Sequence, residues 1–161
     1  MEIVRGDASR LGEVGPLFKS MHEHHRGLGP QALQFRSGEE AWERRRPHYE
    51  GLLGSGRGHL LLAEEDGRVL GYAMVSVIGS QVTLATGDRM AELETLSVAE
   101  GERGQGVGRA LMDAAYAVMR ELGVNEVMLY VIEGNDSAVR FYENLGMRPY
   151  LRVMVGPVPP E

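Results

Sequence analysis

The sequence predicts an α+β fold, a mixed α/β arrangement in which helices pack around one mostly antiparallel, twisted sheet. Three observations support this prediction: short apolar runs typical of strands, amphipathic runs with helical spacing, and the order of the two along the chain. That order is strand, two helices, three strands, helix, strand, helix, strand. The sheet should therefore hold about six to seven strands, the seventh from segment 79–89, flanked by about four helices.

The strand predictions rest on β-branched and apolar runs bounded by turn residues. The clearest hairpin joins two such runs at Asp66-Gly67, a pair that favours the tight turn between antiparallel strands. The predicted strands are 1–6, 58–65, 68–79, 90–98, 124–132 and 147–155.

Start and stop signals mark the helices. Asp7 or Ser9 can cap the first, and Ser37 with Glu40 forms a capping box at the start of the second. Pro47 should kink or restart that second helix. The predicted helices cover about 9–28, 38–53, 108–122 and 135–145.

Length and composition favour one domain over residues 1–155, followed by a flexible tail over 156–161. The chain of 161 residues has no cysteine, which removes disulfides, thiolate metal sites and a cysteine nucleophile. No signal peptide and no apolar run long enough to span a bilayer are seen, so we expect a cytoplasmic protein that does not insert into membranes. The net charge of −6 disfavours nucleic acid as a partner and favours a cationic one.

A glycine-rich turn precedes the third predicted helix. Gly104, Gly106 and Gly108 alternate with other residues, and Arg103 and Arg109 flank them. The first turn of a helix has unpaired amides and a dipole that favours negative charge, so glycines there let a phosphate approach the backbone. A tight turn without a ligand is the alternative. The pattern lacks the Gly-Lys-Ser/Thr of a P-loop and the last glycine of the dinucleotide fingerprint.

Two blocks resemble the GNAT superfamily of N-acetyltransferases. The run "LETLSVAEGERGQGVGRALM" is similar to its acetyl-CoA-binding motif, and "LYVIEGNDSAVRFYENLGMRPY" to its second block. The matching residues are Arg103, Gly106 and Gly108 in the first block and Asn135, Phe141, Tyr142, Leu145 and Gly146 in the second. The resemblance implies the GNAT fold and acetyl-CoA as co-substrate, with the pyrophosphate on the loop amides and the pantetheine arm along the strand that ends at Val98. The coenzyme-binding residues that it implies are Leu96, Ser97, Val98, Arg103, Gly104, Gln105, Gly106, Val107, Gly108, Arg109, Asn135, Ala138 and Tyr142.

The catalytic residues follow from the same resemblance. Tyr142 matches the tyrosine that protonates the departing thiolate, although it could be a core aromatic like Phe141. Glu92 and Glu94 alternate along one strand and share a sheet face, where relatives often carry the general base. Glu94 is slightly favoured over Glu92. The pair could instead form a solvated face, or attract a cationic substrate without accepting its proton.

The histidine-rich segment "MHEHHRGL" gives no metal prediction, because adjacent helix positions point apart and no second ligand cluster stands out. His22 or His25 could contact the acceptor, and a satisfied, partly buried histidine is the alternative.

We therefore predict an N-acetyltransferase that acts on a small-molecule or protein amine by direct attack in a ternary complex. A non-catalytic module that binds acyl-CoA as a sensor is the alternative. A homodimer is common in the superfamily, and the strand 147–155 is compatible with a partner sheet.

Overall fold

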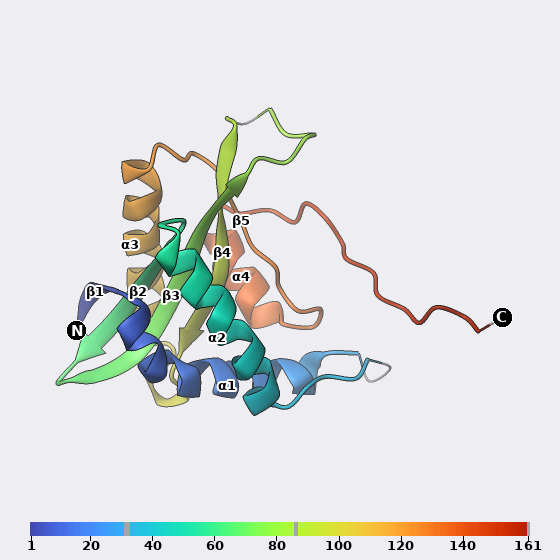
Figure 1. Ribbon diagram of the computed structural model, residues 1–161, viewed down its shortest axis with the longest axis horizontal. Coiled ribbons are helices and arrows are strands. Elements are labelled where there is room, and N and C mark those ends of the chain that lie inside the picture. The colour runs from blue at the N-terminus through green and yellow to red at the C-terminus, as the bar shows by residue number, and fades with distance from the viewer. Residues whose placement is uncertain (31–32, 86, 161) are drawn as a thin grey trace.

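The computed structural model describes residues 1–30, 33–85 and 87–160. One sheet of five strands lies between helices on its two faces (Figure 1). The elements in chain order are β1 (Glu2–Gly6), the short 3-10 helix η1 (Ala8–Arg10), α1 (Leu11–Leu28), α2 (Gly38–Gly54), β2 (Gly58–Glu65), β3 (Arg68–Gly79), β4 (Arg89–Val98), the 3-10 helix η2 (Glu100–Glu102), α3 (Val107–Glu121), β5 (Val127–Met128) and α4 (Asp136–Asn144).

The strands lie in the order β1-β2-β3-β4-β5. Neighbours from β1 to β4 pair antiparallel, and β5 pairs parallel to β4. The α+β class and the mostly antiparallel sheet are thus confirmed, as are the four helices. The Asp66-Gly67 hairpin is confirmed too: both residues have positive φ, 50° and 74°, as this turn requires.

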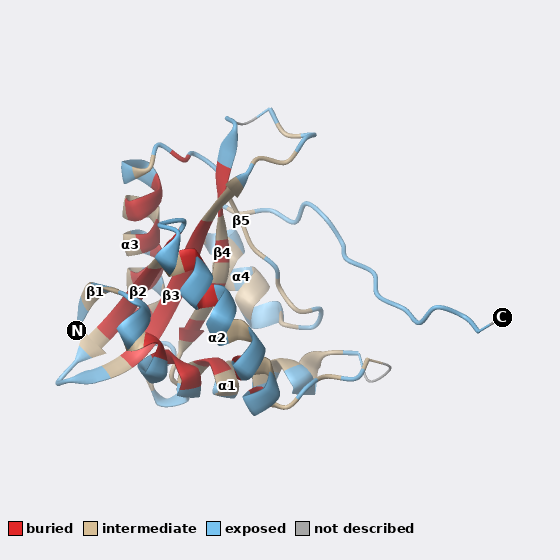
Figure 2. Cartoon of the chain, viewed as in Figure 1, coloured by how far each residue is buried: buried red, intermediate tan, exposed pale blue. Residues whose placement is uncertain are grey.

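Two apolar layers form the core, one on each face of the sheet (Figure 2). On one face α3 buries Leu111, Met112 and Ala115 against β2, β3 and β4. On the other, α1 and α2 bury Leu11, Phe18, Trp42 and Tyr49 against β2 and β3. The burial of both faces of the middle strands explains why β2 and β3 read as nearly continuous apolar runs.

The prediction of about six to seven strands was wrong, because the described residues form five. Segment 147–155, predicted as the last strand, has no strand pairing, and its apolar side chains are exposed. The described part of 79–89 adds no strand between the ends of β3 and β4. The predicted strand 124–132 shortens to Val127–Met128, so it offers little edge for a further strand.

Side-chain caps are present at the starts of α2 and of the short helix η1. Ser37 and Glu40 form the predicted capping box of α2, in which each side chain accepts from the backbone amide of the other. Asp7 caps η1 rather than α1. The expected restart at Pro47 does not occur, because α2 continues through it to Gly54 while Tyr49 and Leu52 bury its second half.

Candidate active site

A cleft of about 420 Å³ lies where the end of β4, the glycine-rich segment 103–109 and α4 meet. We call this segment the glycine loop. The C-terminal half of α1 closes the cleft from a further side. The end of β4 and the glycine loop are neighbours in the sequence, whereas α1 and α4 are distant from them and from each other, so the fold brings together groups that no single motif contains. The lining residues are Met21, His24, His25, Leu96, Ser97, Val98, Glu102, Arg103, Gly104, Gly106, Gly108, Arg109, Asn135, Ser137, Ala138, Phe141 and Tyr142.

The glycine loop leaves backbone amides facing the cleft. Gly104 and Gly106 have positive φ angles of 76° and 86°, a backbone conformation that residues other than glycine rarely adopt. The first amide bonded within α3 is that of Ala110, which donates to the carbonyl of Gly106 at 3.0 Å. The amides of the preceding turn are therefore available to an anion, as expected at a helix N-terminus.

Gly108 has a different role from the other two glycines. A Cβ atom there would lie 3.6 Å from Phe141 and 3.7 Å from Val98, which is ordinary contact. A side chain at this position would therefore reach into the space between β4 and α4. The glycine keeps this part of the cleft open.

The strand β4 has a free edge beside the cleft. Its pairing with β5 is limited to Ala91 with Val127 and Glu92 with Met128. Beyond that point the backbone from 93 to 98 has no strand partner among the described residues on the side away from β3. An extended, amide-containing ligand can use such an edge in the way an added strand would.

The helix α4 supplies the opposite wall. Asn135 caps it by accepting from the amide of Ala138 at 3.3 Å, which fixes the start of the helix at the cleft. One turn further, Tyr142 lies in the wall of the cleft next to Phe141, with the two ring centroids 5.2 Å apart. Burial, and to a smaller extent the neighbouring Tyr116, raises the pKa of Tyr142 to about 12. Its phenol is therefore protonated at neutral pH and can donate a proton.

The two glutamates of β4 lie on the sheet face that α1 and α2 cover. A β-bulge falls at Glu94: Met74 pairs with Thr95 and Val75 with Leu93, so Glu94 is the inserted residue. As a result Glu94 and Thr95, although adjacent, both reach α2. Thr95 lies 2.5 Å from the hydroxyl of Tyr49, and Glu94 contacts two other α2 side chains.

Glu94 is a fixed carboxylate, 8% exposed. One oxygen accepts from the Ser76 hydroxyl at 2.7 Å. The other lies 3.3 Å from an Arg45 guanidinium nitrogen and 3.1 Å from His48 Nε2. The Arg45 guanidinium also lies over the rings of Phe18 and Tyr49, at 5.9 and 5.7 Å from their centroids, so it has little freedom to move.

Glu92 is in a different situation, although it lies on the same strand. Burial and the nearby Glu94 carboxylate, in that order, raise the pKa of Glu92, and Arg45 and His48 only partly oppose them. A partly buried carboxylate with a raised pKa is better suited to accept a proton near neutral pH than an ordinary one.

Most of the residues predicted to bind the coenzyme line the cleft, and two do not. Val107 is buried against the core below the loop, and Gln105 turns its amide to the carbonyl of Gly101 at 2.9 Å. His25 lies in the cleft wall, whereas His22 lies outside it, with Nε2 2.9 Å from the carbonyl of Arg36. Among the described residues no group of three or more His, Cys, Asp or Glu could hold a metal ion.

Other lining residues were not predicted from the sequence. They are Met21, His24, Glu102, Ser137 and Phe141. Met21, His24 and His25 follow one helix face by their spacing of three and four, but the sequence alone does not say what that face covers. Phe141 matches the family motif, but that match does not predict that its ring lines the cleft.

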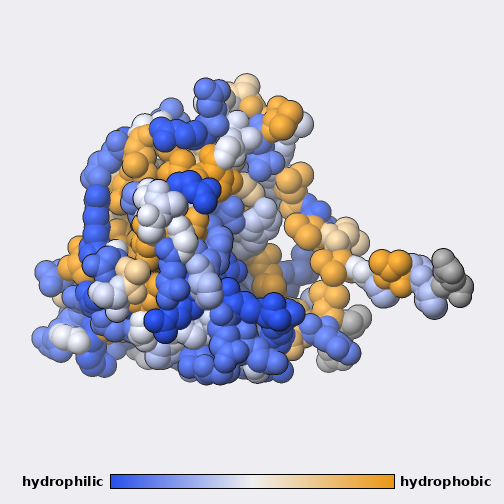
Figure 3. All heavy atoms as spheres, in the orientation of Figure 1, coloured by the Kyte–Doolittle hydropathy of each residue, from blue (hydrophilic) through white to orange (hydrophobic). Residues whose placement is uncertain are grey.

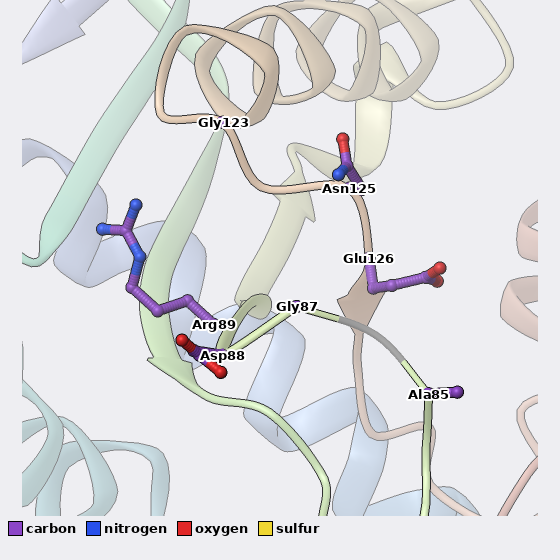
Figure 4. Close-up of a pocket in the computed structure, with 7 residues that line it drawn as sticks. All are labelled: Ala85, Gly87, Asp88, Arg89, Gly123, Asn125 and Glu126. Carbon is purple, nitrogen blue, oxygen red and sulfur yellow. The ribbon is translucent and has the colours of Figure 1, made fainter.

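A second hollow of about 380 Å³ lies at the opposite end of β4 (Figure 4). Asp88 and Arg89 lie on one side of it, Asn125 and Glu126 on the other. Arg89 donates to the carbonyl of Leu122 at 3.1 Å, next to the C-terminal end of α3. This hollow shares no lining residue with the cleft, so it is separate from the candidate active site.

The comparisons with known proteins agree with this geometry. The model of the acetyltransferase (GNAT) family matches residues 18–147. A mycothiol acetyltransferase from Thermobispora bispora is 44% identical over 85 residues, which are 53% of this chain and 28% of that protein. The match thus covers less than a third of the length of this curated relative.

Solved structures share the fold at low sequence identity. The tetramutant of the BH1408 protein from Bacillus halodurans has a TM-score of 0.80 and 21% identity, covering 98% of this chain and all of that one. A predicted acetyltransferase from Clostridium acetobutylicum, solved with acetyl-CoA, has a TM-score of 0.75 and 14% identity, covering 95% of both chains. None of the described helices is long and apolar enough to cross a membrane.

Proposed function

The chain belongs to the acetyltransferase (GNAT) family, and from this premise we propose that it is an acetyl-CoA-dependent N-acetyltransferase acting on a primary amine. The observation that carries the proposal is the single cleft that gathers the glycine loop, the free edge of β4 and Tyr142. Members of this family use acetyl-CoA, and the cleft offers amides for its pyrophosphate and a strand edge for its pantetheine arm.

The chemistry requires an amine without its extra proton and a thiolate that receives one. A lysine-like amine with a pKa of about 10.4 costs about 4.6 kcal/mol to neutralise at pH 7, so a nearby base matters. Neither Glu92 nor Glu94 is among the residues that line the cleft. The raised pKa of Glu92 favours it for this role, because Glu94 is engaged by Ser76, Arg45 and His48. This reverses the slight sequence-based preference for Glu94.

In the proposed reaction the ammonium group first gives its extra proton to Glu92, and the neutral amine nitrogen then attacks the thioester carbonyl. The C–S bond breaks, and the leaving thiolate takes the phenolic proton of Tyr142. The phenolate takes the remaining extra proton from the new amide nitrogen, and Glu92 returns its proton to solvent. Because the chain has no cysteine, no thiol of the protein carries the acetyl group, and direct attack in a ternary complex is favoured.

The acceptor is proposed to be a small or protein amine. The name of the mycothiol acetyltransferases makes mycothiol and related amines the first candidates to test. The Glu92 carboxylate and the net charge of −6 support an acceptor that is positively charged.

We also propose that the chain forms a homodimer through residues 148–155 and acts in the cytoplasm. These residues run away from the body of the molecule (Figure 1), and Leu151, Val153 and Met154 are 69%, 66% and 83% exposed. Figure 3 shows hydrophobic residues along this extended arm. Sedimentation of the chain with and without Leu151→Asp tests the dimer, since a monomer in both cases contradicts it. The lack of cysteine supports a reducing compartment, and cell fractionation tests it.

Calorimetric titration with acetyl-CoA, followed by a thiol-release assay over a panel of amines, tests the proposed activity. Binding with thiol release on one amine class supports the enzyme and identifies its acceptor. Binding without release on any amine favours the acyl-CoA sensor instead. No binding contradicts the assignment of the cleft.

A further inference from the structure

The C-terminal turns of α1 form one wall of the candidate coenzyme cleft. Met21, His24 and His25 line it together with the glycine loop and α4. Because positions three and four apart share a helix face, α1 turns this face to the cleft as a unit. Two of these three residues carry an imidazole, so this wall can bind an anion as well as an apolar chain.

The charges around His25 are mostly positive. Burial lowers the pKa of His25, and its neighbours His24, His22 and Arg103 lower it further. Arg103 donates to the carbonyl of Val98 at 3.4 Å and has no carboxylate partner among the described residues.

The other charged groups of the cleft do not offset this excess. Glu102, the carboxylate of the lining, forms an ion pair with Arg68 at 3.5 Å and accepts from Gln105 at 3.3 Å. Arg109 pairs with Asp113 at 3.0 Å on the exposed side of α3. The positive groups of the cleft therefore favour an anionic ligand, while burial and the same positive neighbours favour the neutral form of His25 in the free protein.

We propose that His25, supported by His24, contacts the phosphate-bearing part of the coenzyme and takes up a proton when the coenzyme binds. This inference rests on the proposed function, because it requires that the cleft bind coenzyme A. It assigns His25 to the coenzyme rather than to the amine acceptor. The negative charge of the pyrophosphate near the loop stabilises the protonated imidazole. The charged form of His25 is therefore favoured in the complex, whereas it is disfavoured in the free protein.

The sign of the pH dependence follows directly. A group whose pKa is lower in the free protein than in the complex favours binding as the pH falls. The affinity for dephospho-coenzyme A should therefore rise several-fold between about pH 8 and pH 6, because each unit by which binding raises the pKa of His25 corresponds to about tenfold in affinity.

Calorimetric titration of the full chain with dephospho-coenzyme A provides the test. This probe keeps the pyrophosphate and lacks the phosphomonoester, whose own proton would otherwise contribute near neutral pH. Titrations at about pH 6.5, where imidazoles respond most, in two buffers with different heats of ionisation count the protons taken up. We expect an uptake of between zero and one proton per ligand bound. The His25→Asn variant should lose this proton uptake and bind the ligand several-fold more weakly.

His22→Asn is the matched control, because His22 lies one turn away on the same helix and outside the cleft. Because His22 lowers the pKa of His25 less than burial and His24 do, this variant should keep most of the proton uptake of the unmodified protein. The histidine signals in an NMR titration give a second readout that does not depend on the variants: the His25 signal should titrate below the usual range in the free protein and at higher pH in the complex.

Equal proton uptake in His25→Asn and in the unmodified protein would overturn the inference, as would affinity that does not change with pH. Failure of the proposed function is distinguishable, because the unmodified protein would then not bind coenzyme A or its dephospho form at any pH.

Discussion

Replacing Tyr142 by Phe should slow acetyl transfer without loosening the coenzyme. Phenylalanine keeps the ring that lines the cleft and packs beside Phe141, and removes only the hydroxyl. Burial and Tyr116 raise the pKa of this hydroxyl to about 12. Compared with an ordinary phenol of pKa about 10, the ionised fraction at pH 9 falls from about 10% to about 0.1%. Tyr142 is thus a proton donor at every pH at which the enzyme would be assayed.

A positioned proton donor contributes about 100-fold to 10,000-fold to a rate. We expect kcat of Tyr142→Phe to fall by this factor, measured by thiol release, while the coenzyme Kd from calorimetry stays within about twofold. Because the pKa is raised, the protonated form persists to higher pH, and Tyr142 should cause no alkaline fall in kcat below about pH 11. Tyr116→Phe, which removes the neighbouring hydroxyl from α3, is the control and should keep kcat. A Phe variant that turns over at the original rate would refute the assignment of Tyr142 as the acid.

Three other substitutions probe the loop, the base and the fold. Gly106→Ala should lower stability by about 1–2 kcal/mol and weaken coenzyme binding, because its φ of 86° is strained for alanine; Gly101→Ala, which meets open space at negative φ, should do neither in melting and titration experiments. Glu92→Gln should remove the acidic limb of the kcat/KM profile, which lies above the usual glutamate range because the pKa of Glu92 is raised. Glu94→Gln should keep that limb but move it to lower pH, since the Glu94 charge no longer raises the pKa of Glu92, and should lower the melting temperature. Loss of the limb in Glu94→Gln and not in Glu92→Gln would make Glu94 the base. Ser37→Ala should lower the free energy of unfolding by about 1 kcal/mol through loss of the capping box, and a change in coenzyme Kd would contradict a purely structural role.

The parts of the fold that depend on local chemistry could be predicted from the sequence. The Asp66-Gly67 turn and the Ser37–Glu40 cap are encoded within a few residues, and both are present. The last strand could not be predicted this way. Segment 147–155 has a strand-like composition, yet a strand exists only where another offers its edge, and β5 offers two residues. Pro47 likewise weakens a helix locally, but the burial of Tyr49 beyond it depends on the sheet below.

The residues of the candidate site also differ in how far they could be predicted from local sequence. The glycine loop and the start of α4 are contiguous motifs, so their residues could be named in advance, and most of them line the cleft. The roles of the two glutamates could not, because strict alternation along β4 makes Glu92 and Glu94 equivalent. The difference between them comes from their neighbours: Glu94 meets Arg45 and His48 of α2, and the bulge brings Thr95 to the same helix. Burial, and after it the charge of Glu94, raise the pKa of Glu92. In the proposed mechanism Glu94 is therefore held by its partners, and Glu92 is the carboxylate that accepts the proton.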